Sequence, residues 1–451
     1  MELLKFNGAK LRDYISPDSL SLSVFYLICL LMVVFPWGNP GIPHAGSTIY
    51  AILIVGGLAL GWNHFSELGF EERALLFACV ALLGIVTLTL VNAENWDRGL
   101  NHVARYVRIA GILPVCLLLR RCGAFSSKAF LAGGIIAGPV LAIQGWYQTQ
   151  ILELELARGA YHHILFGDLS ALAVAIVLAG LLTLGHKGWH YTLGLLSISA
   201  GIGANLLSGA RNAWLFLALL ALMLPWLYRG ALGKRQLAWL ATALVLFVVT
   251  MAVWRPPLLA ERLADGIDDL RIYWQDPSQD TSWGARLALW RNSLVIFSES
   301  PLLGTGIGDF REDNVKLAGN SFSYMATRQF SHAHSVYFHA LAEMGIVGFA
   351  VLTLSLFVLP LRYFYIHWHD ATTPEARFCG LAGLLSVFAF AVFGIGETWL
   401  VRNAPVNAYV ISVAVFIAGL SAIENRPGHQ EREIIPRSLY STGDARDNDS
   451  S

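Results

Sequence analysis

Charged residues are scarce in this sequence. Of its 451 residues, 14% are Asp, Glu, Lys or Arg, whereas 55% are hydrophobic. An average globular domain carries about 25% charged residues, so this chain has too little charge to cover a soluble particle of its size. Apolar runs of about 20 residues recur along nearly the whole length, as a protein that crosses a bilayer many times requires. A soluble enzyme is therefore largely excluded.

Three other features are missing. There is no excess of charge of one sign, because Lys plus Arg and Asp plus Glu number 31 each, and this disfavours nucleic acid as a partner. The five cysteines lie in apolar runs or on the predicted cytoplasmic side, so neither a disulfide framework nor a cysteine zinc site is expected. No small-residue cleavage pattern follows the basic residues near the N-terminus, which favours an uncleaved first span.

The apolar runs predict an all-α, polytopic integral membrane protein with about twelve transmembrane helices. The predicted spans lie near residues 21–37, 47–64, 74–91, 104–119, 129–147, 166–185, 191–207, 212–228, 236–254, 335–359, 376–396 and 404–423. They divide the chain into spans one to nine (1–254), a periplasmic loop domain with short helices (255–333), spans ten to twelve (334–423) and a tail (424–451) expected to be disordered.

The basic residues predict the orientation. Lys and Arg are concentrated in the short loops that are cytoplasmic if the N-terminus is inside, and they are sparse in the short loops on the other side. Both termini are therefore predicted to be cytoplasmic, and the loop at 255–333 is predicted to be periplasmic. This loop is too long to be a simple connection between two spans.

One segment of the long loop has helical periodicity. In residues 283–297, Arg286, Trp290, Ser293 and Phe297 fall on one stripe, and Pro301 with the glycines after it ends the helix. We expect a short helix at the outer membrane interface, with Arg286 at the depth of the lipid phosphates.

Histidines precede the tenth span, in Ser331-His332-Ala-His334-Ser335. On a helix, one face would carry His334, Phe338, Leu341, Gly345 and Gly348. This arrangement predicts an imidazole at the water end of a stripe whose glycines let another helix or a lipid chain approach. His334 could then accept a proton near neutral pH.

Two other interpretations of these histidines stay open. His332, His334 and His339 could be interfacial residues that are satisfied by water and backbone groups. A zinc site is less expected, because none of the spacings between these histidines is the four residues that place two ligands on one helical face.

Arginines at the outer ends of spans are costly unless they have water, a partner or a phosphate. Arg211 begins the predicted eighth span, and Arg286 lies on the interfacial helix. If these two guanidiniums and His334 converge, they predict a substrate with anionic oxygens. Any single arginine could instead be explained by snorkelling of its side chain to the lipid headgroups. Weaker candidates of the same kind as Arg211 and Arg286 are Arg105, Arg108, Arg158 and Arg402.

The carboxylates near this predicted face are Asp168, Glu343 and Glu397. Glu343 follows His334 by nine positions, so it is expected on the opposite side of the helix. Glu397, at the outer end of span eleven, is the candidate partner of His334, although it could instead pair with Arg402. The glycines at 304, 306 and 308 do not form a phosphate-binding loop, because no Lys-Ser/Thr follows them.

The block from Arg286 to Gly348 resembles the shared domain of bacterial O-antigen ligases, O-antigen polymerases and protein O-oligosaccharyltransferases. It contains an arginine-rich lead (Arg286–Arg291), the turn Pro301-Leu-Leu-Gly304-x-Gly306, and His334-Ser335 followed by nine residues and Gly345-x-x-Gly348. The last spacing is similar to the signature of the lipopolysaccharide O-antigen ligases in particular.

The resemblance implies a glycosyltransferase at the periplasmic face of the inner membrane of a Gram-negative bacterium. The donor would be O-antigen linked to undecaprenyl diphosphate, the acceptor a sugar hydroxyl of lipid A-core, and the transfer inverting. His334 resembles the general base, and Arg211 and Arg286 resemble the diphosphate-binding arginines. Possible accessory residues are Glu397, Arg291, His332 and Arg158. No metal ion, nucleotide or other cofactor is expected, and the partners are membrane lipids rather than nucleic acid.

Three alternatives remain. An O-antigen polymerase would share the periplasmic loop, so the ligase prediction rests mainly on the spacing from His334 to Gly348. A protein O-oligosaccharyltransferase is disfavoured, because the residues after 423 leave no room for an added domain. A transporter or flippase of lipid-linked glycan predicts inverted repeats and ionisable residues near the midplane, whereas no repeat is evident and the candidate charges lie at one face.

Overall fold

A computed structural model describes residues 20–184, 188–227, 256–275, 281–318 and 330–424. Within these ranges every regular element is a helix, which confirms the predicted fold class. The predicted ninth span (236–254) and nearly all of the predicted disordered tail lie outside the described residues.

The helices up to the long loop are α2 (Leu22–Gly41), α3 (Ala45–Gly56), η2 (Gly57–Gly61), η3 (Trp62–Glu67), α4 (Phe70–Leu88), η4 (Thr89–Asn92), α5 (Trp96–Ala110), α6 (Ile112–Arg120), α7 (Ala124–Trp146), η5 (Tyr147–Ile151), α8 (His163–Thr183), α9 (Gly188–Ser208) and α10 (Arg211–Leu227). From the loop onward they are α12 (Pro256–Gln275), α13 (Ser282–Glu299), α14 (Phe310–Ala318), α16 (Val336–Thr353), η6 (Leu354–Val358), α17 (Leu359–His369), α18 (Pro374–Gly396), η7 (Trp399–Val401) and α19 (Asn403–Glu424).

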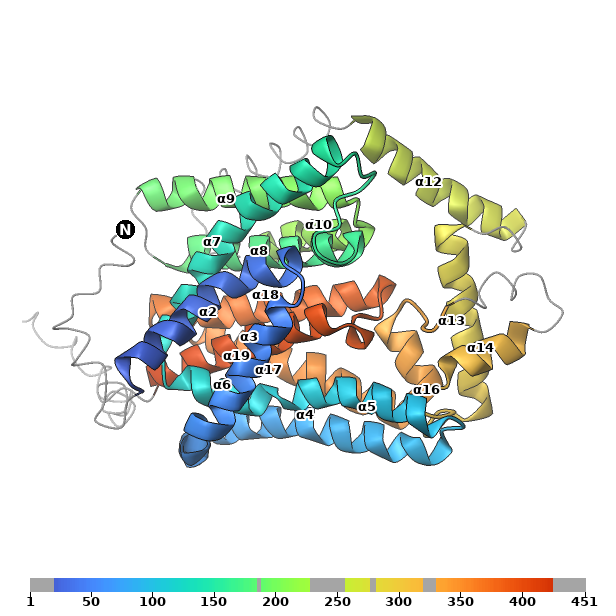
Figure 1. The fold of residues 1–451 in the computed structure, drawn as a ribbon, viewed down its shortest axis with the longest axis horizontal. Helices are drawn as coiled ribbons and strands as arrows, with labels where there is room; N and C mark the ends of the chain where they lie inside the picture. Colours follow the sequence, from blue (N-terminus) through green and yellow to red (C-terminus); the bar gives the residue numbers. More distant parts are fainter. Residues whose placement is uncertain (1–19, 185–187, 228–255, 276–280, 319–329, 425–451) are drawn as a thin grey trace, which may run out of the picture.

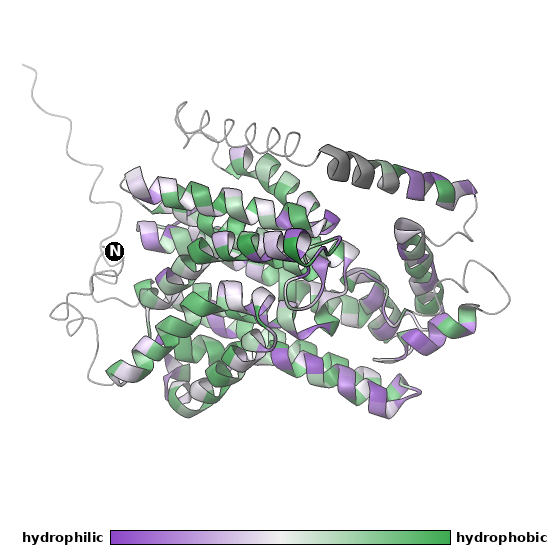
Figure 2. Ribbon diagram, turned by 45° about the horizontal axis from the view of Figure 1, so that its top comes forward, coloured by the Kyte–Doolittle hydropathy of each residue, from purple (hydrophilic) through white to green (hydrophobic). Residues whose placement is uncertain are grey.

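Ten helical runs in the described part of the chain are long and apolar enough to cross a membrane. The helix Arg211–Pro225, at the predicted eighth span, is apolar but shorter. Large apolar side chains such as Leu30, Val55, Ile143 and Leu196 are exposed around the bundle. Exposure of this extent suits a surface covered by lipid, and Figure 2 shows the apolar residues spread along the bundle. The chain is a multi-pass membrane protein.

The most buried helices form the centre of the bundle. α8, α18 and α19 are almost fully enclosed, whereas α2 and α3 expose most of their surface. Figure 1 shows α8, α18 and α19 running in roughly the same direction, whereas α3 crosses them steeply and α13 crosses near the ends of the bundle beside α12 and α14. Polar residues gather on α14 and the adjacent end of α5 (Figure 2). The polar elements therefore collect at one end of the bundle.

Ion pairs join loops that the sequence places on the same side of the membrane. The predicted cytoplasmic end carries the pairs Lys128–Glu375 (3.2 Å), Arg120–Glu67 (3.7 Å) and Arg362–Glu71 (4.0 Å). The predicted periplasmic end carries Lys316–Glu94 (2.6 Å) and Arg402–Glu397 (3.5 Å). The pairing agrees with the predicted grouping of the loops into two ends.

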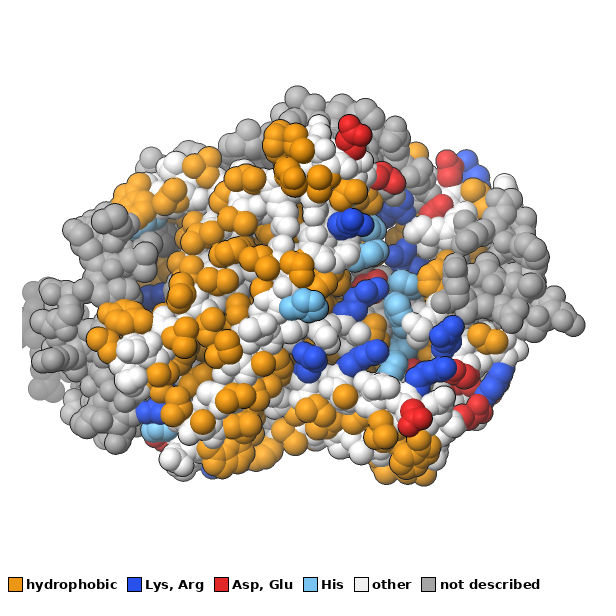
Figure 3. Space-filling model, in the orientation of Figure 1, with side chains coloured by type: hydrophobic (Ala, Val, Ile, Leu, Met, Phe, Trp, Pro, Cys, Tyr) orange, Lys and Arg blue, Asp and Glu red, His pale blue; other side chains and the backbone are white. Residues whose placement is uncertain are grey.

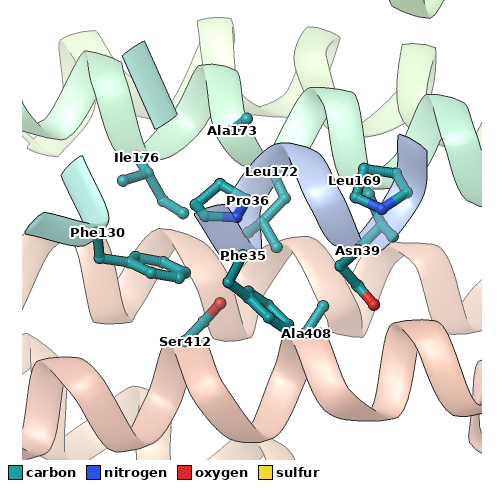
Figure 4. A pocket seen from close by; sticks show the side chains of 11 residues that line it. Phe35, Pro36, Asn39, Phe130, Leu169, Leu172, Ala173, Ile176, Ala408 and Ser412 are labelled. Carbon is teal, nitrogen blue, oxygen red and sulfur yellow. The ribbon is translucent and has the colours of Figure 1, made fainter. Parts of the chain in front are cut away.

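A small cavity lies inside the bundle between α2, α7, α8 and α19 (Figure 4). Its walls are mostly apolar, among them Phe35, Phe130 and Ile176. Asn39 Oδ1 and Ser412 Oγ are buried there without a hydrogen-bond partner in the described residues. The volume of about 20 Å³ has room for one water molecule. This cavity is too small for a lipid chain or a sugar, so the site must lie elsewhere.

Helical geometry in α16 breaks at Gly345, which has φ 60° and ψ −166°. A turn from the long loop fits into the break through four backbone bonds, from Ile346 N–H to Pro301 O (2.9 Å), Val347 N–H to Leu302 O (3.2 Å), Thr305 N–H to Ala342 O (3.2 Å) and Gly306 N–H to Glu343 O (3.2 Å). Where a helix breaks inside a membrane, the backbone N–H and C=O groups that lose their helical hydrogen bonds need other partners in the protein. Gly345 permits a close approach, as predicted, but the segment that approaches is the backbone of Leu302–Gly304 rather than another helix or a lipid chain.

Replacing Gly345 by alanine should therefore destabilise the protein. A Cβ at this position would lie 2.5 Å from the carbonyl group of Leu302, and the positive φ disfavours any side chain. We expect a loss of about 2 kcal/mol or more, measured as a lower Tm of the detergent-solubilised protein. The control is Gly84→Ala on α4, where no atom lies within 4 Å of the new methyl group. Equal Tm values for the two variants would contradict this account of the break.

Candidate active site

His334 lies at the centre of the polar end, in the turn before α16. Its Nδ1 is 3.2 Å from Glu397 Oε2, and its ring lies 4.4 Å from the ring of His332. Nε2 of His332 is 3.7 Å from the other oxygen of Glu397. The two histidine side chains are partly exposed, at 17% and 13%, whereas the Glu397 side chain is 2% exposed. A buried carboxylate therefore holds two imidazoles at the surface, and the predicted pair of His334 and Glu397 is in contact.

The start of α16 is tied to the end of α18 by two further hydrogen bonds. Ser335 Oγ donates to Gly394 O at 3.2 Å, and Tyr337 O–H donates to Ala391 O at 2.7 Å. These bonds fix the segment that carries His334 relative to the segment that carries Glu397. Ser335 thus has a positioning contact that its place in the sequence motif did not reveal.

His334 itself is not helical. Its φ of 49° lies in the left-handed region, where residues other than glycine are uncommon, and α16 begins only at Val336. The predicted helical stripe from His334 to Gly348 is therefore wrong at both ends, since His334 precedes the helix and Gly345 interrupts it. A backbone in this region costs about 1–3 kcal/mol and persists only where the surroundings enforce it. Here the bonds of His334 and Ser335 to α18 and Glu397 do so.

The charge of Glu397 is set by competing effects. Burial raises its pKa, but the close contacts with His332 and His334 outweigh burial and hold the pKa well below its ordinary value. Arg402 Nε, 3.5 Å from Oε1, adds a further positive charge. Burial lowers the pKa of His332, and the nearby carboxylate of Glu397 opposes that shift. Glu397 is consequently a carboxylate at neutral pH and can stabilise a protonated imidazole.

Replacing Glu397 by glutamine should slow turnover by about 10²-fold, because the amide keeps the shape but cannot stabilise a positive charge on His334. The kcat of purified protein in lipid would measure this effect. The same substitution at Glu375, which pairs with Lys128 at the other end of the bundle, is the control. An unchanged kcat in Glu397→Gln would show that the carboxylate does not assist His334.

Glu397 should also make the folded state sensitive to acid. A carboxylate whose pKa is lowered by folding contributes stability above about pH 5, and the contribution disappears as the pH falls through the folded-state value. We expect the Tm of the wild type to fall further than that of Glu397→Gln between neutral pH and acid. Parallel Tm curves would contradict the lowered pKa.

Arg286 lies near the start of α13, as predicted. Its Nε donates to Gly396 O at 3.3 Å, and its Nη1 donates to Ser282 O and Oγ at 3.1 and 3.0 Å. The guanidinium carbon is 5.8 Å from the centre of the Trp283 ring, within reach of a cation–π contact. Burial lowers the pKa of Arg286, but an arginine stays charged. A fixed positive charge therefore lies next to Gly396, the residue before Glu397.

The stripe that carries Arg286 faces protein along much of its length. Trp290 stacks on Phe338 of α16 with ring centres 5.0 Å apart, and Ser293 is fully buried. Much of this stripe is therefore covered by protein. Packing on α16 sets the position of Arg286 relative to His334.

Arg211 is the first residue of α10, as predicted, and follows a turn in which Gly209 has φ 62°. Its Nη1 is 3.8 Å from Asp269 Oδ2 on α12. The same oxygen of Asp269 accepts the N–H of Trp283 at 3.3 Å, at the start of α13. Asp269 therefore links the arginine of α10 to the helix that carries Arg286.

Gly396 is the place where these parts meet. The carbonyl of Gly396 accepts a hydrogen bond from Arg286, and the next residue, Glu397, contacts His334. Gly396 also packs closely on the Asn212 side chain, since a Cβ at this position would lie 2.2 Å from Asn212 Oδ1. The charges of Arg211 and Glu397 both act on Arg286. The imidazole and the two guanidiniums thus converge at one end of the bundle. Figure 3 shows basic and histidine side chains along a hollow at this end.

The other candidate residues are less closely connected to His334. Arg402 pairs with Glu397, so the two predicted partners of this carboxylate both contact it. Arg158 is exposed on the loop before α8, where its backbone N–H donates to Gln148 Oε1 at 2.9 Å, and Arg291 is exposed on α13. Asp168 is buried in α8.

The remaining predictions concern α5 and α16. Arg105 Nη1 lies 3.3 Å from His102 Nε2, and the carbonyl of Arg108 accepts from Tyr50 O–H. Glu343 contacts His339 at 3.4 Å rather than His334, in agreement with its predicted position on the other side of the helix.

Two residues near the centre were not predicted. Asp269 lies on α12, a helix that the sequence pattern did not predict. His162 precedes α8, and its charge interacts with those of His334, Glu397 and Arg402. The adjacent pair His162-His163 at the start of a predicted span was the signal that could have identified this position.

Part of the chain that carries the candidate site is similar to a known protein family. A sequence model described as O-antigen ligase matches residues 195–353. In this segment, which is less than half of the chain, the sequence is similar to the O-antigen ligase/polymerase superfamily. The matched segment contains Arg211, Arg286 and His334 and ends before Glu397. An uncharacterised protein of Haemophilus influenzae is 23% identical over 350 residues, which cover 77% of this chain and 86% of the relative.

The similarity gives the site a chemical context. Proteins of this superfamily are glycosyltransferase-like membrane enzymes, and their substrates are lipid-linked polysaccharides. General-base catalysis uses an imidazole with a carboxylate partner, and anion binding uses guanidiniums; groups of both kinds converge at this end of the bundle.

Proposed function

We propose that this chain is an O-antigen ligase, which moves polysaccharide from undecaprenyl diphosphate to a sugar hydroxyl of lipid A-core at the periplasmic face of the inner membrane. The segment Gly396–Glu397 supports this proposal most, because its carbonyl binds Arg286 and its carboxylate binds His334. A proton acceptor thereby lies beside a cation that a diphosphate can bind. Transfer from a diphosphate carrier needs these two groups close together.

His334 acts as the general base in this proposal. With Nδ1–H donating to Glu397, Nε2 has a free lone pair for the acceptor hydroxyl. As Nε2 takes the proton, the hydroxyl oxygen forms a bond to the anomeric carbon, and the bond from that carbon to the diphosphate breaks. The electron pair leaves with the diphosphate, and the configuration at the anomeric carbon inverts.

The arginines act on the leaving group. Negative charge grows on the diphosphate as the bond breaks, and Arg211 and Arg286 stabilise it with charged hydrogen bonds. Asp269 orients Arg211 through their ion pair, and the carbonyl of Gly396 orients Arg286. Arg402 keeps the site positively charged beside Glu397. The leaving group therefore needs no acid, and the acceptor alone needs a base.

A second candidate is an O-antigen polymerase, whose acceptor would be another carrier-linked glycan. The same base and arginines serve both reactions, and the spacing from His334-Ser335 to Gly345-x-x-Gly348 favours the ligase. Envelope glycolipids of a deletion strain, separated on a gel, distinguish the two. A ligase predicts the loss of every O-antigen band from the core, whereas survival of the band with a single repeat unit would identify a polymerase.

A further inference from the structure

A second group of histidines and a carboxylate lies beside the candidate active site, on α5 and α16. His339 and Glu343 are one helical turn apart, with His339 Nε2 3.4 Å from Glu343 Oε2. His102 of α5 places Nδ1 3.9 Å from the same oxygen. The three atoms all lie within 4.8 Å of one another. Two imidazoles and a carboxylate from distant parts of the chain therefore point at a common centre.

The geometry of this group is not that of a hydrogen-bonded network. Glu343 Oε2 has no hydrogen-bond partner in the described residues, although two imidazole nitrogens are close to it, and the Glu343 side chain is only 1% exposed. His339 is also buried, with a side chain 4% exposed. Ligands of one metal ion have this arrangement, because their lone pairs point at the ion rather than at each other. Tetrahedral zinc with bonds of about 2.1 Å separates its ligand atoms by about 3.4 Å.

The surroundings of Glu343 hold its carboxylate in a fixed orientation. Its other oxygen, Oε1, accepts the backbone N–H of Phe310 at 3.3 Å, and the Phe310 ring lies edge-on to His339 at 5.3 Å. Ligating carboxylates in metal sites are usually held by such outer hydrogen bonds. Oε2 is thereby presented to the two imidazoles.

We propose that His102, His339 and Glu343 bind a divalent transition-metal ion, represented here by zinc. Two neutral imidazoles and one carboxylate are a common three-ligand set for zinc, and water completes the tetrahedron. The ion would link α5 to α16 and, through Phe310, to the start of α14. This site is separate from His334, and the proposed transfer assigns no step to it. The sequence did not reveal this site, because His102 is far from His339 and Glu343 in the chain.

Arg105 competes with the metal ion for His102. Its Nη1 donates to His102 Nε2 at 3.3 Å, which requires the imidazole proton to be on Nδ1, the atom that would bind the ion. Metal binding moves that proton to Nε2 and displaces Arg105. Removing Arg105 should consequently tighten metal binding, since both the competing hydrogen bond and a positive charge are lost.

The test is a zinc titration of the full-length protein in detergent, with metal content measured by mass spectrometry after removal of excess ion. We expect one tightly bound zinc ion per chain in the wild type. We expect loss to background in His102→Ala and Glu343→Gln, and tighter binding in Arg105→Ala. His369→Ala, at an exposed histidine outside the cluster, is the matched control and should retain the ion.

Cobalt binding to His102→Cys tests the site without relying on a loss of signal. A thiolate at this position would ligate Co²⁺ and produce a charge-transfer absorption in the near ultraviolet, which a misfolded variant would not show. Absence of bound zinc in the wild type, or absence of this absorption, would overturn the proposal. Loss of zinc in His334→Ala with retention in His102→Ala would also overturn it, because the ion would then belong to the candidate active site.

Discussion

His334→Ala should reduce glycan transfer by about 10²–10⁴-fold, the range that a general base contributes. The imidazole is partly exposed, and its Nδ1 contacts Glu397, which leaves Nε2 to act as the proton acceptor in the proposed reaction. Alanine removes the proton acceptor and leaves Arg211 and Arg286 in place, so donor binding should persist. In cells we expect carrier-linked O-antigen to accumulate while modified lipid A-core disappears, as measured on gels of envelope lipids.

The control for His334 is His64→Ala, at a partly exposed histidine that pairs with Glu67 at the predicted cytoplasmic end. This variant should transfer glycan at the wild-type rate. Membrane insertion and Tm of both variants must match the wild type, which separates lost chemistry from lost folding. A wild-type rate in His334→Ala would remove the imidazole from the mechanism.

Arg286→Lys should lower kcat by about 10²-fold, although the charge is kept. Arginine here donates through Nε to Gly396 and through Nη1 to Ser282, and its planar fork is held against Trp283. A lysine ammonium cannot make these contacts and bind a diphosphate at two points. Steady-state rates with carrier-linked glycan, measured at saturating donor, would show the effect on kcat rather than on binding alone.

The matched control for Arg286 is Arg311→Lys, at an exposed arginine on α14. Its rate should not change, because nothing in the proposed chemistry depends on it. Full activity of Arg286→Lys would show that the leaving diphosphate does not depend on the guanidinium at this position.

Much of the fold could be predicted because hydrophobic length decides it. Each long apolar run must be helical to satisfy its backbone in a bilayer, so the spans follow from composition alone. The importance of Arg211 and Arg286 at helix starts could also be predicted, because a charge at the edge of a membrane is costly unless it has a partner. Turn residues after Glu299 correctly placed the end of α13.

The geometry around His334 could not be predicted, because contacts distant in sequence determine it. The break at Gly345 depends on a turn at 301–306 that supplies its hydrogen bonds, and a stripe drawn on an ideal helix ignores such a partner. The left-handed backbone of His334 depends on bonds to α18. The helix α12 with Asp269 was missed because its mixed polar sequence gives no membrane signal.

The most direct test is reconstitution of the purified protein in vesicles with undecaprenyl diphosphate-linked glycan and lipid A-core. The account predicts a covalent glycan–lipid A-core product, release of undecaprenyl diphosphate, and inverted configuration at the new linkage, with no product from His334→Ala. Movement of the glycan lipid across the bilayer without a covalent product would contradict the account and identify a transporter.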